Sequence, residues 1–125
     1  MSVYPSFGPD ALTHELTANG VTMRVVVEGE GPDIVFVPGG DQTADAYSQQ
    51  FARLSDSYRC TSYDPRGAGE TTAPPPPWTM ADYAADCAAV IDAFAEGRAV
   101  VCGLSLGGLV TQQTAIDFPD KVRLA

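Results

Sequence analysis

The first regular pattern along the chain is an alternation of apolar and polar residues within residues 11–31. It begins at Leu12 and reaches Leu16, and the valine-rich stretch "VTMRVVV" follows after Asn19 and Gly20. An Asn-Gly pair between two β-rich stretches is typical of a type I′ turn. The pattern therefore predicts an antiparallel hairpin that turns at these two residues.

Beyond the hairpin, short apolar runs alternate with segments of helical periodicity. A continuous apolar run fits a strand that is buried on both faces, whereas apolar residues spaced three and four apart form one face of a helix. Strands are expected at residues 33–37, 58–64 and 98–103, and helices at 47–58, 78–97 and 106–118. This order predicts an α/β fold with a mostly parallel sheet and helices on both of its faces.

The helix expected at residues 78–97 has the most complete set of local signals. Thr79 is the expected N-cap, and Asp82 stands three residues later, where a capping box needs an acceptor. Trp78 and Tyr83 occupy the two positions of a hydrophobic staple. The acidic side chains of this segment are expected on its solvated face: Asp82, Asp86, Asp92 and Glu96.

The composition fits one small globular domain that spans residues 1–125. With 45% hydrophobic and 18% charged residues, the chain has enough apolar surface to build a core. Its formal net charge of -9 and its lack of a basic cluster argue against binding to nucleic acid or to an anionic membrane surface. No apolar run approaches the length of a membrane span, and the first ten residues lack the pattern of a secretory leader.

The cysteines and the polar residues limit the chemistry further. Cys60, Cys87 and Cys102 show no C-x-x-C spacing, so we expect free thiols in a reducing compartment, namely the cytoplasm. The sequence contains no cluster with metal-ligand spacing and no cofactor signature. We therefore expect neither a metal nor a cofactor.

The strongest chemical signal is the segment "GLSLG" at residues 103–107, which matches the G-x-S-x-G pattern of a nucleophile elbow. A buried strand is expected directly before it and a helix directly after it, which is the context that the motif requires. The strand brings Ser105 to the carboxyl edge of the sheet, where sites in open α/β folds form. A glycine two residues to either side leaves room for the sharp bend.

The chain resembles the N-terminal half of the α/β-hydrolase fold family over nearly all of its length from Leu12 onward. The segments "IVFVPGG", "YDPRGAGET", "CGLSLGG" and "FPDKV" resemble four family segments in the family's order. They correspond to the strand 3 oxyanion loop, the turn after strand 4, the elbow after strand 5, and the approach to strand 6. The resemblance implies an incomplete α/β-hydrolase fold that lacks strands 6–8.

The resemblance also implies roles for three residues. Ser105 would be the nucleophile, and the backbone N–H groups of Leu106 and Gly40 would form the oxyanion hole, in which each donor contributes about 3 kcal/mol to lowering the barrier. The chain departs from the family at Pro38, where histidine is frequent, and at Ala68, where histidine is also frequent. Neither departure removes a backbone donor or a catalytic group.

The sequence does not supply the acid and base that the elbow needs. The single histidine, His14, precedes the serine and lies in the hairpin, whereas the family order is serine, then acid, then histidine. Asp117 and Asp120 lie at the far end of the following helix, about 15 Å from Ser105 along its axis. Asp64 is expected, like Arg66, to order the turn after its strand rather than to take part in catalysis.

The sequence ends at the entrance to a sixth strand, which would leave the elbow strand as a bare apolar edge. We therefore expect the C-terminal half of the same enzyme, on a second chain or a cleaved segment, to carry the missing acid and histidine. The expected reaction is hydrolysis of small carboxylic esters or lactones through a serine acyl-enzyme. The elbow segment "CGLSLGGLV" resembles in particular that of enol-lactonases, related esterases and haloperoxidase-like hydrolases.

Two other classes of function are compatible with parts of the sequence. A non-catalytic hydrolase-like domain would use its pocket or open edge to bind a partner. A dinucleotide-binding domain would use "GAGETT" after a strand, but prolines follow where its helix should begin. Labelling of Ser105 by a fluorophosphonate distinguishes an enzyme from a binding domain.

Overall fold

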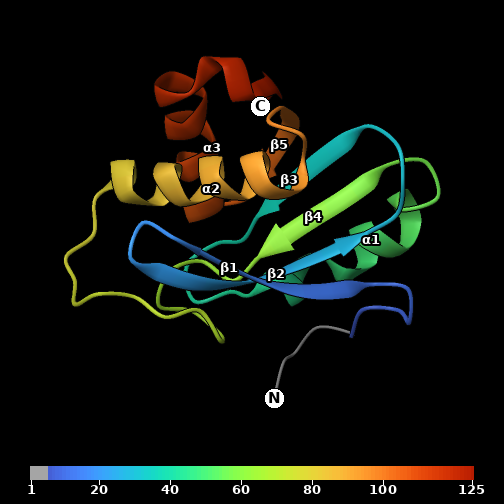
Figure 1. Ribbon diagram of the computed structural model, residues 1–125, viewed down its shortest axis with the longest axis horizontal. Helices are drawn as coiled ribbons and strands as arrows, with labels where there is room; N and C mark the ends of the chain where they lie inside the picture. The colour runs from blue at the N-terminus through green and yellow to red at the C-terminus, as the bar shows by residue number, and fades with distance from the viewer. Residues whose placement is uncertain (1–5) are drawn as a thin grey trace.

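The computed structural model describes residues 6–125 as a six-stranded sheet with helices on both faces (Figure 1). Residues 1–5, which form part of the segment predicted to lack a leader, lie outside the described residues. The strands are β1 (Leu12–Ala18), β2 (Val21–Glu28), β3 (Asp33–Val37), β4 (Arg59–Tyr63), β5 (Ala99–Gly103) and β6 (Val122–Leu124). The helices are α1 (Ser48–Leu54), α2 (Met80–Phe94) and α3 (Leu106–Asp117), with 3-10 turns η1 (Ala44–Tyr47) and η2 (Pro119–Lys121).

The strand order in the sheet is β1-β2-β4-β3-β5-β6. The pairs β1–β2 and β2–β4 are antiparallel, and the pairs β4–β3, β3–β5 and β5–β6 are parallel. The parallel strands β3, β4 and β5 therefore end at the same edge of the sheet, which is the edge where binding sites form in such folds. The predicted hairpin is confirmed, with positive φ at both Asn19 (54°) and Gly20 (77°) as a type I′ turn requires.

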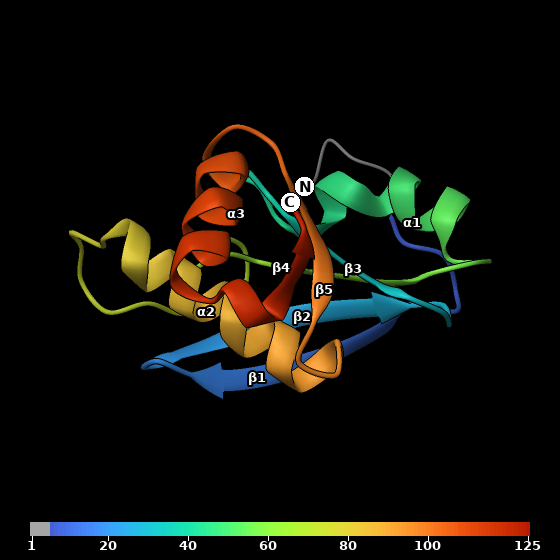
Figure 2. The same cartoon turned by 90° about the horizontal axis from the view of Figure 1, so that it is seen from above.

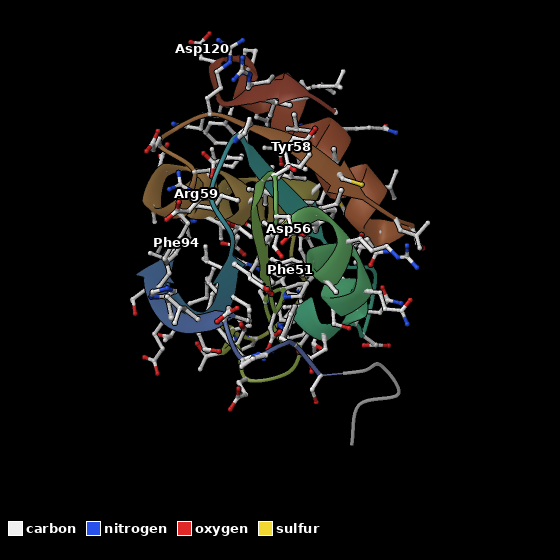
Figure 3. The ribbon with its side chains drawn as sticks, turned by 90° about the vertical axis from the view of Figure 1, so that its right-hand side faces the viewer. Phe51, Asp56, Tyr58, Arg59, Phe94 and Asp120 are labelled. Atoms are coloured by element: carbon white, nitrogen blue, oxygen red, sulfur yellow. The ribbon has the colours of Figure 1, made fainter. Side chains whose placement is uncertain are left out.

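Each face of the sheet packs against its own helices (Figure 2). Successive residues of a strand point to opposite faces, so Val35 joins the core under α2 and α3 while Phe36 joins the core under α1. Phe51, labelled in Figure 3, is fully buried between α1 and the sheet. The fold class expected from the sequence is confirmed, because buried strands alternate with helices that cover both faces.

Helix α2 begins as its sequence predicts. The Thr79 side chain accepts a hydrogen bond from the Asp82 backbone, and the Asp82 carboxylate accepts one from the Thr79 backbone. The rings of Trp78 and Tyr83 meet edge to face at 6.2 Å, which completes the hydrophobic staple. This helix start fixes Trp78 beside Gly67 in the turn after β4.

Three details differ from the predictions. Strand β6 pairs in parallel with β5 through Ala99 and Val100, so the elbow strand is not a bare edge and the first residues of a sixth strand are present. Asp86 is 1% exposed rather than solvated, because Arg66 from the turn after β4 pairs with it. The helix expected at residues 47–58 ends at Leu54, and the chain turns before β4.

Candidate active site

The central feature of the site is the sharp bend that joins β5 to α3 at Ser105. Ser105 has φ of 59° and ψ of -123° and its side chain is exposed. A positive φ in a residue with a side chain costs about 1–3 kcal/mol and persists only where the surrounding structure enforces it. This strained geometry is the one that the G-x-S-x-G pattern predicts for a nucleophile elbow.

Two glycines permit that bend, and the structure shows why each must be glycine. A Cβ on Gly103 would collide with the backbone of Gly107 and would stand 2.6 Å from the Thr111 hydroxyl. A Cβ on Gly107 would collide with the carbonyl oxygen of Val37 and would stand 2.7 Å from that of Pro38. The elbow is therefore pressed both against its own helix and against the end of β3.

The loop after β3 is the second component of the site. A β-turn closes it, in which the Gln42 N–H donates to the Gly39 carbonyl at 3.2 Å and the Gln42 side chain accepts from the Gly39 N–H at 2.9 Å. Asp41 has a φ of 60°, which the third residue of a type II turn requires. These bonds hold Gly40 at the exposed tip of the turn.

The elbow and this loop touch, so the three predicted site residues share one rim. A Cβ on Gly39 would lie 3.3 Å from the Leu104 carbonyl oxygen, and one on Gly40 would lie 3.8 Å from the Leu106 side chain. Within residues 6–125, no hydrogen bond engages the backbone N–H of Gly40 or of Leu106. Both donors are available to an anionic oxygen, and the N-terminal end of α3 adds its positive dipole at Leu106.

Tyr47 supports this arrangement, although the sequence predicts for it only a position on the apolar face of a helix. Its hydroxyl donates to the Val37 carbonyl at 3.0 Å, and its ring packs against Phe36 at 4.9 Å. Burial raises the pKa of Tyr47 to about 12, so the phenol keeps its proton at neutral pH. The residue therefore anchors the base of the β3 loop as a donor and does not serve as a base.

Asp64 and Arg66 order the neighbouring loops, as expected from the sequence. The Asp64 carboxylate accepts from the backbone N–H of Ala44 at 2.9 Å and of Glu70 at 3.1 Å, and it pairs with Arg24 at 3.2 Å. It thereby ties the β3 loop to the turn after β4. Arg66 makes two hydrogen bonds to Asp86, at 2.7 and 2.9 Å, and these bonds raise its pKa.

The histidine of the chain lies far from the elbow. His14 is exposed on β1, with its ring 5.2 Å from that of Phe94, and three strands separate β1 from β5. Asp117, at the last residue of α3, accepts from Gln113 and lies at the opposite end of the helix from Ser105. The part of the chain that the structure describes therefore places no histidine–carboxylate pair beside the serine.

Two hollows border the elbow. A cavity of about 270 Å³, here called the loop cavity, is lined by the β3 loop, the turn after β4, the start of α2, and Leu106. A groove of about 440 Å³ runs along β5, β6 and α3 on the other side of the elbow, and Cys102 lines it.

Residues 6–125 contain no group of three or more histidine, cysteine, aspartate or glutamate side chains that could hold a metal ion. Among the same residues, no helix has both the length and the apolarity to cross a membrane.

The chain is similar to known hydrolases in sequence and in structure. Residues 34–125 match the model of the alpha/beta hydrolase family. The chain is 32% identical over 108 residues to 3-oxoadipate enol-lactonase 2 of Acinetobacter baylyi, covering 85% of this chain and 40% of that protein. It is 33% identical over 103 residues to 2-(acetamidomethylene)succinate hydrolase of Mesorhizobium japonicum, covering 82% and 37%.

Solved structures of hydrolases are also similar to the chain. The crystal structure of an epoxide hydrolase from Vigna radiata superposes with a TM-score of 0.86 at 27% identity, covering 91% of this chain and 38% of that one. The crystal structure of E-2-(acetamidomethylene)succinate hydrolase superposes with a TM-score of 0.84 at 30% identity, covering 90% and 42%. The chain thus spans about two fifths of the length of these relatives.

Proposed function

This chain belongs to the alpha/beta hydrolase family, and we propose that it is the nucleophile-bearing part of a serine hydrolase acting on small carboxylic esters or lactones. One observation carries the proposal. An exposed serine sits on a strained bend beside two backbone N–H groups that have no partner among residues 6–125. A turn with only a structural role would need neither the strain nor the free donors.

In the proposed reaction, the Ser105 oxygen attacks the carbonyl carbon and a base accepts its proton. The carbonyl oxygen becomes an oxyanion that accepts hydrogen bonds from the N–H groups of Gly40 and Leu106. Collapse of the tetrahedral intermediate breaks the bond to the alcohol oxygen, which takes up the proton, and leaves an ester on Ser105. Water then attacks this ester, and the carboxylic acid and free serine are released.

The nucleophile supports an acyl substrate over an epoxide, although several of the similar proteins are epoxide hydrolases. A serine oxygen that opened an epoxide would form an ether, and water does not cleave an ether by the route described above. An ester on the same oxygen is open to attack by water at its carbonyl carbon. The two backbone donors also fit the carbonyl oxygen that becomes charged when an acyl group is attacked.

The base and its orienting acid are proposed to come from the C-terminal half of the enzyme, on a second chain or a cleaved segment. The greater length of the relatives supports this proposal. The exposed apolar side chains support it as well: Leu124 lines the groove, and the elbow and α3 carry three more, Leu104, Leu109 and Ile116. Exposed apolar side chains that gather on one side mark a surface that another segment covers.

All three cysteines are free thiols, which supports a reducing compartment such as the cytoplasm.

The test supplies the missing base from solution. The purified chain and its S105A variant are incubated with a nitrophenyl ester and a series of imidazole concentrations, and release of nitrophenol is measured. We expect the chain to exceed the variant by an amount that grows with imidazole, and a fluorophosphonate to label Ser105 under the same conditions. Equal rates for the two proteins, with no labelling, would instead favour the non-catalytic binding domain.

A further inference from the structure

The loop cavity lies directly beside the two oxyanion donors. Gly40 and Leu106 both line it, so any group attached to the reacting carbonyl on that side must enter it. We propose that the loop cavity binds an uncharged, ring-sized apolar substituent of the substrate, and that Asp41 selects against substrates that carry a carboxylate there. This inference rests on the proposed function, because it concerns the substrate of the same site.

One wall of the cavity is aromatic and fixed in place, and it is formed by Trp78 and Tyr83. The Trp78 indole donates to the Pro74 carbonyl at 2.9 Å and meets the Tyr83 ring edge to face. Gly67 lies so close to the indole that a Cβ at this position would collide with the ring. A wall held from three sides loses little freedom when a ligand binds, which favours affinity for an apolar group.

The size of the cavity sets the size of the group. A cavity of about 150 Å³ is enough to bind benzene in a well-studied case, and the loop cavity measures about 270 Å³. It therefore has room for a single six-membered ring together with the carbonyl that the oxyanion donors hold.

The charges around the cavity set the polarity of the group. Only two charged side chains line it, Arg66 and Asp41. Arg66 is already neutralised by two hydrogen bonds to Asp86, and its side chain is 4% exposed. The Asp41 side chain is exposed on the turn after Gly40 and takes part in no ion pair among residues 6–125. The cavity thus presents one uncompensated negative charge, which repels a carboxylate.

The test uses the tryptophan of the chain, since Trp78 is the only one and it forms the cavity wall. Cyclohexyl methyl ketone and its 4-carboxylate have the same ring and the same carbonyl, cannot be hydrolysed, and do not absorb where tryptophan emits. Each is titrated into the chain at low salt while Trp78 fluorescence is recorded. We expect saturable binding of the neutral ketone, and a Kd at least about threefold larger for the carboxylate, the scale of an exposed charge interaction.

Two variants make the assignment specific. D41N removes the charge and keeps the turn, because asparagine also tolerates the positive φ at this position. D56N is the matched control, since Asp56 is an exposed carboxylate before β4, at the opposite end of the parallel strands from the cavity. We expect D41N to bring the two Kd values within about twofold of each other and D56N to leave the difference unchanged.

Either of two outcomes overturns the inference: no saturable change with the neutral ketone, or a Kd difference that D41N leaves intact. Binding of the ketones does not require Ser105 to react, so S105A is expected to bind both as the unaltered chain does. A chain that binds the neutral ketone but hydrolyses no ester would refute the proposed function alone. A chain that hydrolyses esters through Ser105 but shows no charge preference would refute the role of Asp41 alone.

Discussion

The buried pair of Arg66 and Asp86 is expected to be the costliest polar interaction in the fold to break. Their side chains are 4% and 1% exposed, and Asp86 also accepts from the Asn19 side chain at 3.2 Å. D86A would leave the buried guanidinium without its hydrogen-bonded counter-charge. Removing one partner of such a pair costs about 3–5 kcal/mol, out of a total free energy of unfolding of about 5–15 kcal/mol for a domain.

Urea unfolding, followed by circular dichroism and by Trp78 fluorescence, measures this loss. The matched control is D92N on the same helix, where the Asp92 side chain is 52% exposed and pairs with Lys121 at 2.6 Å. An exposed pair of this kind is worth at most about 1 kcal/mol. We therefore expect D86A to destabilise the chain at least three times as much as D92N, on the ratio of these two ranges.

The double variant R66L/D86L separates the effect of charge from the effect of packing. Replacing both partners of a buried pair by apolar side chains removes the unpaired charge and restores much of the lost stability. A loss below about 1 kcal/mol in D86A would refute the reasoning, because a buried guanidinium would then be tolerated without a partner. So would a double variant no more stable than D86A.

Three further predictions concern the elbow, a helix cap and the buried thiols. In urea titrations, G107A should lower the free energy of unfolding by about 1–3 kcal/mol or more, because its Cβ would collide with β3. G108A, whose Cβ would lie 3.5 Å from its nearest neighbour, should leave the free energy of unfolding unchanged or raise it by about 0.5 kcal/mol. Equal effects of the two substitutions would contradict the packing described. T79A should lower the free energy of unfolding by about 1 kcal/mol, whereas T79S should keep most of the stability of the unaltered chain. Equal stability of T79A and the unaltered chain would show that the capping box contributes nothing. Burial raises the pKa of Cys60 and Cys87 from 9.0 to about 11, so the unfolded chain releases these protons first. The free energy of unfolding should therefore fall as the pH rises from 9 towards 11, and a flat profile over that range would count against it.

Local signals in the sequence account for most of the fold. The Asn19-Gly20 turn, the capping box at Thr79 and the unbroken apolar runs each depend on residues close together in the chain, and each is confirmed. Asp86 was misplaced because its spacing fits a solvated helix face equally well. Its partner Arg66 lies 20 positions earlier in a turn, and only tertiary packing brings the two together.

The candidate site was also predictable where its signals are local in the sequence. Ser105 follows from a five-residue pattern in a strand–helix context, and Gly40 and Leu106 follow from the family resemblance. Their roles remain predictions, while their shared position on one rim is a feature of the structure. The anchoring by Tyr47 and the wall formed by Trp78 depend on contacts across loops, from Tyr47 to Val37 and from Trp78 to Gly67, which periodicity does not encode.

The strain at position 105 lies in the main chain and not in the side chain that occupies it. Gly103 and Gly107 permit the bend because neither has a Cβ that would collide, and the exposed serine side chain makes no capping hydrogen bond. On the role proposed for Ser105, a thiol or a carboxylate placed at this position would therefore be presented in the same way and would face the same two backbone donors.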